Sequence, residues 1–239
     1  MTYNVHSCIG MDGKVSPQRI ARVIGQYEPD IVALQELDMG RKRTHHMDQP
    51  HLIAKELEML YHFHPSIQVE EEKYGNAVLS RYPMDLVCAM KLPKLESKLK
   101  FEPRGAIWVS VEIGDVRLQI INAHLSFYGR ECAYQAKALM SPEWIGHVNC
   151  APPAILCGDF NCLPNSVAWR TINNRLRDAQ YSLEKHRPRA TWFGRYPIGR
   201  IDHVFISSDI KVSAIEVSKT ELNKLASDHL PLIIDMEIL

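Results

Sequence analysis

The sequence AILCGDFN, residues 154–161, joins a short apolar run to a glycine, an acid and an amide. The apolar run predicts a buried strand, so Asp159 and Asn161 should lie just beyond its end. A carboxylate this close to buried apolar sequence is costly unless it is paired or binds a metal. By itself the segment is equally compatible with an ordinary turn, in which Asp, Asn and Gly are common.

The same arrangement recurs elsewhere in the chain. Its other members are Glu36 after the apolar run 31–34, His124 after the run 118–121, and Asp228 with His229 at the start of the run 232–238. Singly, Glu36 is compatible with a surface acid, His124 with a structural histidine and Asp228 with a cap or turn residue. Strand ends of α/β sheets gather at one rim, where ligands usually bind. The recurrence therefore favours one functional site.

Apolar periodicity predicts short strands that alternate with helices. Ser16 and Pro17 begin a helix whose apolar stripe ends at Tyr27. Further helices are expected at 48–60, at 131–148 with a kink or a break at Pro142, and at 165–176 with Asn165 as the N-cap. Strands are expected before Asn4 and at 31–34, 77–80, 85–90, 107–113, 116–120, 154–157, 201–206, 212–217 and 232–238. This mixture predicts a layered α/β sandwich in one domain, residues 1–239.

Composition narrows the class of protein. The 239 residues are 46% hydrophobic and 23% charged, which is typical of a globular chain, and the formal net charge is zero. Zero net charge argues against binding to nucleic acid by bulk charge alone. Six cysteines without a C-x-x-C pair indicate free thiols in a reducing compartment. With no apolar run of the ~18 residues that span a membrane and no signal peptide, we expect a cytoplasmic protein.

The candidate residues share one kind of chemistry. Carboxylate and amide oxygens without cysteine suit Mg²⁺ or Mn²⁺ better than zinc. A carboxylate can deprotonate a water, and an imidazolium can stabilise charge that develops on phosphate oxygens. The residue types therefore predict metal-assisted hydrolysis of a phosphoester.

The ordered set of motifs resembles the endonuclease/exonuclease/phosphatase superfamily, whose fold is that of pancreatic deoxyribonuclease. The motifs are Thr2-Tyr3-Asn4, Gln35-Glu36, Tyr74-Gly75-Asn76-Ala77, Ser80-Arg81-Tyr82-Pro83, Arg104-Gly105, Asn122-Ala123-His124-Leu125, Gly158-Asp159-Phe160-Asn161, Arg200-Ile201-Asp202 and Ser227-Asp228-His229-Leu230-Pro231. They span residues 2–231, and the likeness is greatest to small bacterial stand-alone members. The resemblance implies a four-layer sandwich of two stacked mixed β-sheets flanked by helices.

The resemblance also implies a role for each matching residue. Metal ligation is implied for Glu36, Asn4 and Asp228. The implied catalytic residues are Asp159, which activates the water; Asn161, which positions it; His229, which contacts the phosphate; Asp202, which orients His229; and His124, a second phosphate-contacting imidazole. Asn76 and Arg104 are implied as substrate-pocket residues.

One departure from the family pattern lies at the amino end. Family members have several apolar residues before the Thr-Tyr-Asn motif, whereas Met1 directly precedes Thr2 here. We therefore expect the first strand to be truncated, or the natural chain to start further upstream.

The substrate depends on residues at the rim of the site. The run GRKRTHH, residues 40–46, predicts a loop in which Arg41 and Arg43 hold phosphates, with a solvated loop as the alternative. Trp192 is expected to stack on a base or to wall a lipid pocket, or else to be tucked into the core. These features rank nucleic acid first as the substrate. A phospholipid such as sphingomyelin, an inositol phosphate or another small phosphorylated molecule is the alternative.

A different class of function, an inactive binding scaffold, is a remote alternative. Such a scaffold is expected to have lost one or more of Glu36, Asp159, Asp202 and His229, and all four are present. No stable protein partner is implied, and a monomer is expected.

Overall fold

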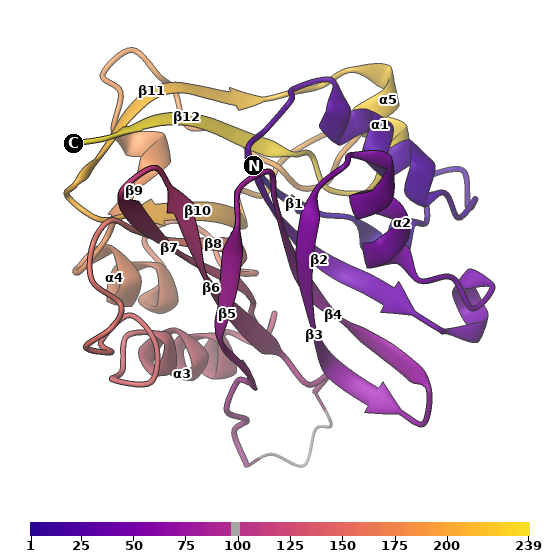
Figure 1. The fold of residues 1–239 in the computed structure, drawn as a ribbon, viewed down its shortest axis with the longest axis horizontal. Helices are drawn as coiled ribbons and strands as arrows, with labels where there is room; N and C mark the ends of the chain where they lie inside the picture. Colours follow the sequence, from indigo (N-terminus) through magenta and orange to yellow (C-terminus); the bar gives the residue numbers. More distant parts are fainter. Residues whose placement is uncertain (97–100) are drawn as a thin grey trace.

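The computed structural model describes residues 1–96 and 101–239, which form two six-stranded mixed β-sheets (Figure 1). The first sheet has the order β11-β12-β1-β2-β4-β3, with the bounds Ile210–Val217, Leu232–Ile238, Thr2–Asn4, Ile31–Met39, Glu72–Ser80 and Leu60–Val69. The second has the order β5-β6-β7-β8-β10-β9, with the bounds Met84–Lys91, Gly105–Ile113, Val116–His124, Ala154–Asp159, Asp202–Ile206 and Arg177–Asp178. Neighbouring strands are antiparallel, except for the parallel pairs β1–β2 and β7–β8.

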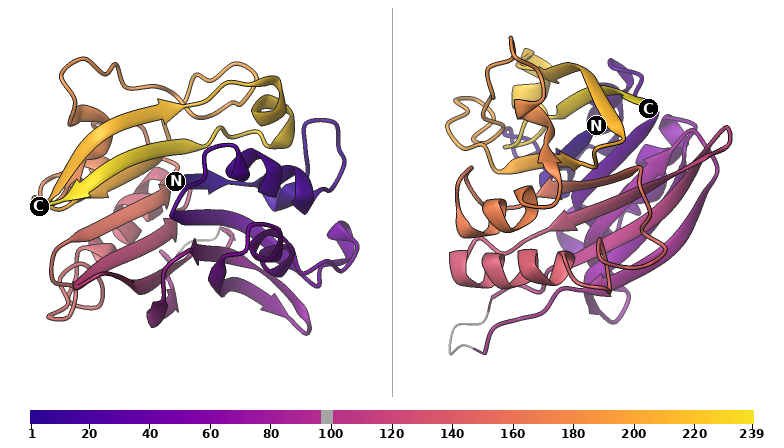
Figure 2. Two further views of the ribbon diagram at one scale, coloured as in Figure 1. Left: turned by 45° about the horizontal axis from the view of Figure 1, so that its top comes forward. Right: turned by 90° about the vertical axis from the view of Figure 1, so that its left-hand side faces the viewer.

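Helices cover the outer faces of both sheets (Figure 2). The α-helices are α1 (Pro17–Gly25), α2 (Gln49–Glu56), α3 (Gly129–Leu139), α4 (Val167–Asn173) and α5 (Glu221–Ala226). The short 3-10 helices are η1 (His6–Cys8), η2 (Lys42–Thr44) and η3 (Ala179–Tyr181). No helix in the described part of the chain is both long and apolar enough to span a bilayer.

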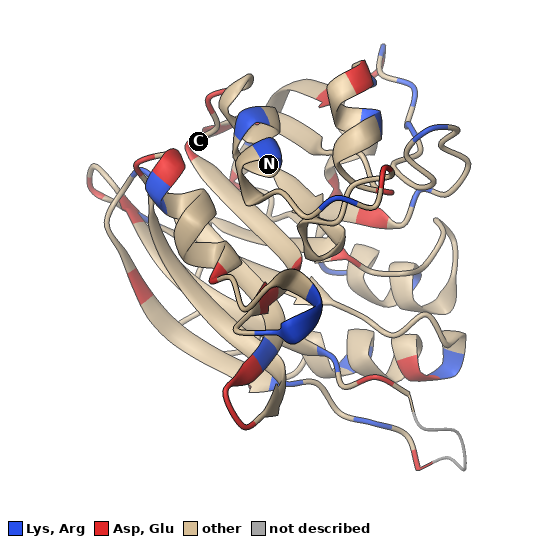
Figure 3. Cartoon of the chain, turned by 90° about the vertical axis from the view of Figure 1, so that its right-hand side faces the viewer, with Lys and Arg blue, Asp and Glu red and all other residues tan. Residues whose placement is uncertain are grey.

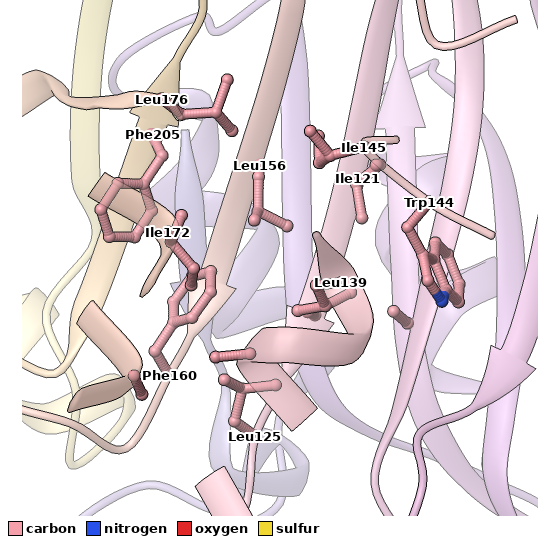
Figure 4. Close-up of a cluster of buried hydrophobic side chains, with 14 of the residues drawn as sticks. Ile121, Leu125, Leu139, Trp144, Ile145, Leu156, Phe160, Ile172, Leu176 and Phe205 are labelled. Atoms are coloured by element: carbon pink, nitrogen blue, oxygen red, sulfur yellow. The ribbon is translucent and has the colours of Figure 1, made fainter. Parts of the chain in front are cut away.

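Three apolar clusters hold these layers together. One lies between α1, α2 and the first sheet, and a second lies between the two sheets. The third packs α3 and α4 on the second sheet, where Leu139 and Ile172 face Ile121, Leu156 and Phe205 (Figure 4). The order helix, sheet, sheet, helix confirms the four-layer sandwich.

The stretch after α2 differs from the predicted helix at 48–60. Asp48 is the N-cap of α2, which agrees with the predicted start of the helix. The helix ends at Glu56, however, and β3 begins at Leu60. Glu58 has a φ of 54°, which interrupts the helix while the apolar spacing continues. Strand β3 was not among the strands expected from the sequence, and it contains Pro65, a residue that disfavours a strand. It is tolerated because β3 is an edge strand with a register shift at that residue.

Two other predicted helices are shorter than expected. The segment 131–148 is helical only to Leu139, so Pro142 lies in a turn beyond α3 rather than at a kink. Asn165 does not cap α4, because its φ of 65° places it in the left-handed region. The cap is Ser166, whose side chain accepts a hydrogen bond from the backbone N–H of Trp169.

A buried charged network joins the loop before β10 to the second sheet. The carboxylate of Asp178 accepts hydrogen bonds from Arg200 Nη2 at 2.6 Å and from Trp169 Nε1 at 2.7 Å, and lies 3.3 Å from His203 Nδ1. Burial alone would raise the pKa of Asp178, but His203 and Arg200 hold it below its usual range. Burial would lower the pKa of His203, yet Asp178 and Cys162 raise it to about 9.

We expect Asp178→Asn to lower the free energy of unfolding by about 3 kcal/mol, since it leaves Arg200 without its buried partner. Asp178 stabilises the folded state above the pKa that its carboxyl has in the unfolded chain, and this stabilisation is lost as the pH falls. His203 stabilises the folded state below the pKa that its ring has in the unfolded chain, and this stabilisation is lost as the pH rises through about 9. Urea titration at pH 7 measures the loss. Glu237→Gln is the control, because Glu237 pairs with Lys211 at the exposed surface and should lose less than about 1 kcal/mol.

Candidate active site

Glu36 lies inside β2, not after the end of a strand as expected from the sequence. The pairing of β2 with β4 shifts register between Leu34 and Leu37, and Glu36 has a φ of 61°. Such a bulge redirects a side chain out of the regular alternation. The bulge allows Glu36 to line a pocket while Leu34 and Leu37 remain in the core.

Asn4 joins the carboxylates of the two sheets. Its Nδ2 donates to Glu36 Oε1 at 2.9 Å and to Asp159 Oδ2 at 2.9 Å. Asn4 ends β1 at the centre of the first sheet, whereas Asp159 ends β8 in the second. The two acids thus share one buried amide although they are far apart in the chain.

Gly158 makes the close approach of β8 to β7 possible. Its φ is 137°, and a Cβ at this position would lie 1.9 Å from the carbonyl oxygen of Ala123. No other residue type fits this backbone position without displacing β7. The glycine before Asp159 is therefore required by the packing of the strands that hold the site.

Asp159 has a shifted acidity. Burial, followed by the nearby charge of Asp202, raises the pKa of Asp159 to about 7. Asp202 is its cross-strand neighbour, since β10 pairs with β8 in that register. A carboxylate with a pKa near neutrality is suited to accept a proton from water.

His229 forms a close pair with Asp202. Its Nδ1 lies 2.8 Å from Asp202 Oδ2, and its Nε2 lies 3.7 Å from Asp159 Oδ2. Burial alone would lower the pKa of His229, but Asp202 and Asp159 raise it to about 10. His229 is therefore an imidazolium held against the acids, with a donor available for a phosphate oxygen.

His124 is in the opposite state. Burial, together with the charges of Arg104 and His229, holds the pKa of His124 well below its usual value. Arg104 Nη1 lies 3.2 Å from His124 Nδ1, and Asn161 Nδ2 lies 3.2 Å from its Nε2. A neutral imidazole accepts at one nitrogen only, so just one of these contacts is a hydrogen bond. Two flanking donors disfavour an imidazolium, so any phosphate contact by His124 is that of an uncharged ring.

Of the other residues predicted from the sequence, some line the same pocket as Glu36 and others do not. Asp228, Arg104 and Trp192 line the same pocket as Glu36, with Asp228 Oδ1 at 3.5 Å from His6 Nδ1. Asn76 is buried and donates to the backbone carbonyl of Gly105, so it links the two sheets. It does not line the pocket.

Arg41 and Arg43 are engaged by acids. Arg43 forms a bidentate pair with buried Asp38 at 2.7 and 2.8 Å, and it also donates to Ser7 Oγ. Arg41 lies 3.6 Å from Glu72 and 3.8 Å from Asp38. Both arginines therefore have carboxylate partners within the protein.

Sequence reasoning missed two kinds of residue at this site. Gln35 and Asn122 belong to the family motifs without an assigned role, and their amides bond at 2.8 Å across the sheet interface. Phe127, Leu163 and Ile198 line the pocket but lie in loops, where no periodic pattern marks them. Only the folded chain brings these three side chains together.

The pocket could hold a divalent cation and a phosphate. Its volume is about 560 Å³, and its polar lining includes Glu36, Asp159 and Asp228. Ligand atoms of Glu36, His124 and Asp159 lie within 4.8 Å of one another, as do those of Asp159, Asp202 and His229. Two carboxylates that share one amide repel each other unless a cation lies nearby. The carboxylate oxygens of Glu36 and Asp159 fit a hard cation. Asn4, expected as a third ligand, instead presents its Nδ2 to both carboxylates, while its Oδ1 accepts from the backbone N–H of His6.

Fold and site together define a phosphoester hydrolase of the two-sheet α/β sandwich type. The sequence profile of the Endonuclease/Exonuclease/phosphatase family matches residues 1–229, and the chain belongs to this family. The uncharacterized protein YbhP of Escherichia coli is 26% identical over 219 residues, which cover 85% of this chain and 81% of YbhP.

Solved structures share the fold over nearly the whole chain. An endonuclease/exonuclease/phosphatase from Beutenbergia cavernae has a TM-score of 0.79 at 25% identity, covering 99% of this chain and 70% of that one. The mannosyl-6-phosphatase of Bacteroides thetaiotaomicron has a TM-score of 0.78 at 20% identity, covering 99% and 98% of the two chains.

Proposed function

We propose that the protein is a divalent-metal-dependent hydrolase that cleaves phosphoesters by attack of water on phosphorus. The observation that carries the proposal is the geometry of Asp159. Its carboxylate shares the Asn4 amide with Glu36 at 2.9 Å and lies 3.7 Å from the His229 imidazole. A base, a metal-ligand set and a cationic donor thus lie together on one side of the pocket.

Each residue then has one task. Glu36, with Asp228 nearby, would hold Mg²⁺ or Mn²⁺, which supplies Lewis-acid stabilisation of phosphate charge when bound. The Nδ2 of Asn4 orients the carboxylates of Glu36 and Asp159. Asp159 accepts the proton of the attacking water, and Asn161 positions that water. The imidazolium of His229 donates to a phosphate oxygen, and Asp202 keeps the ring oriented. Neutral His124 is buried, does not line the pocket and lies against Arg104 and Asn161, so it would orient these two side chains rather than contact the phosphate.

For the substrate, the geometry favours a small phosphorylated molecule over a polynucleotide. A polyanion needs several free cations, and Arg41 and Arg43 are paired with Asp38 and Glu72. Viewed from the right-hand side of Figure 1, the basic and acidic segments of the described residues are interspersed (Figure 3). Nucleic acid, ranked first from the sequence, remains the alternative substrate. Hydrolysis of single-stranded DNA, RNA and abasic duplex, compared with sphingomyelin and inositol phosphates, tests this order.

Chelation tests the metal. We expect hydrolysis of bis-p-nitrophenyl phosphate in Mg²⁺ or Mn²⁺ to fall at least about 100-fold in EDTA, because metal stabilisation of phosphate charge contributes several kcal/mol. Release of p-nitrophenolate gives the rate, and excess Mg²⁺ should restore it. Equal rates with and without chelator would contradict the role assigned to Glu36.

A further inference from the structure

Exposed apolar side chains surround the mouth of the active-site pocket. Phe127, Leu163, Trp192 and Ile198, hereafter the apolar collar, are 66%, 56%, 36% and 81% exposed, and all four line the pocket that contains Asp159. Large apolar side chains that remain in water and converge on a functional pocket mark a binding surface.

The collar is built from three separate segments. Phe127 follows β7, Leu163 follows β8 two residues beyond Asn161, and Trp192 and Ile198 flank a turn before β10. Trp192 is tied to the site itself, since it forms backbone bridges to His229 and to Gly199. The strand ends that deliver the catalytic groups therefore also deliver the collar.

The charges that line the pocket distinguish a region suited to a phosphate from a region suited to an apolar group. Among the described residues that line it, the cations are His229, whose Nδ1 is paired with Asp202 and which has only Nε2 left for a phosphate, and Arg104, which lies 2.6 Å from Glu102. The acidic centre suits one metal-bound phosphate, and the collar offers apolar contact without further cations. A chain with several phosphates would find little compensation there.

From this arrangement we infer that the apolar collar is a subsite for an uncharged apolar group, aryl or alkyl, directly attached to the reacting phosphate of a small soluble substrate. The inference rests on the proposed function and narrows its substrate class. The pocket volume of about 560 Å³ falls in the range that encloses small ligands.

Binding of phosphonates tests the subsite without a leaving group. Methyl-, phenyl- and hexylphosphonate share one phosphonate head, and at a pH where all three are dianions their dissociation constants differ through the organic group alone. We expect calorimetric titration in Mg²⁺ to show hexyl- and phenylphosphonate binding about 10-fold more tightly than methylphosphonate. In Phe127→Ala combined with Ile198→Ala, this preference should fall below about 3-fold, and Leu163→Ala should reduce it independently.

Val148→Ala is the matched control, because Val148 is an exposed apolar residue that does not line the pocket. Its preference for hexylphosphonate should equal that of the wild type. Equal affinity of the wild type for all three phosphonates would overturn the subsite and leave the hydrolase intact. No binding of any phosphonate, with no hydrolysis of bis-p-nitrophenyl phosphate, would overturn both. Sedimentation with phosphatidylcholine vesicles that Phe127→Ala abolishes would assign the collar to a membrane and also overturn the proposal.

Discussion

Replacement of Asp159 by Asn is expected to lower kcat for bis-p-nitrophenyl phosphate at least about 100-fold, the size of a general-base contribution. The carboxamide keeps the size of the side chain and an oxygen that accepts from Asn4, but it cannot take a proton from water. Steady-state kinetics in saturating Mn²⁺ separate this loss from weaker metal binding. A folded variant with the wild-type rate would reject Asp159 as the base.

The folding control for this variant has a definite sign. Folding raises the pKa of Asp159 from 3.8 to about 7, so in metal-free protein the ionised carboxylate costs stability increasingly as the pH rises through this window. Asp159→Asn should therefore resist urea at pH 8 at least as well as the wild type. Asp115→Asn, in the exposed β6–β7 turn, is the matched change and should keep full activity.

Removal of the His229 imidazole is the second large effect. We expect His229→Ala to lower kcat about 100- to 1,000-fold, since its cationic donor at the phosphate is lost. Asp202 orients the ring of His229, and its charge also raises the pKa of Asp159, but it does not itself contact the phosphate, so Asp202→Asn should cost less than His229→Ala. The double variant should then be no slower than His229→Ala alone.

The measurement is a double-mutant cycle on kcat with bis-p-nitrophenyl phosphate. His51→Ala, an exposed histidine in α2, serves as the control and should leave kcat unchanged. Fully multiplicative losses in the double variant would mean that Asp202 and His229 act independently, against the 2.8 Å contact between them.

Local sequence was sufficient for the elements whose pattern is complete within one segment. Ser16 and Pro17 define the start of α1, and Gly114 with Asp115 defines the turn between β6 and β7. The motif at 158–161 places Asp159 at the end of β8, where an apolar strand must meet solvent. The family motifs then indicated the sandwich of two mixed sheets, which the structure confirms.

Other features depend on contacts between distant segments. The bulge that turns Glu36 into the pocket arises from the pairing of β2 with β4, and β3 is a strand only because β4 accepts it at the sheet edge. From the sequence alone, Arg41 and Arg43 were predicted to bind phosphate. Asp38 and Glu72, from β2 and β4, pair with them only in the folded chain.

The amino-acid sequence by itself determined the chemistry: which acids, amides and imidazoles are present, and that Asp159 and His124 stand at the ends of apolar strands. Tertiary structure alone decided their charge states and surroundings. The neighbours that reach each buried group across the sheets set its protonation. They raise the pKa values of Asp159 and His229 and lower that of His124, so that one histidine is charged and the other neutral. The tertiary structure also brings together loops that are distant in the sequence, and this places the separate apolar residues of the collar around one site.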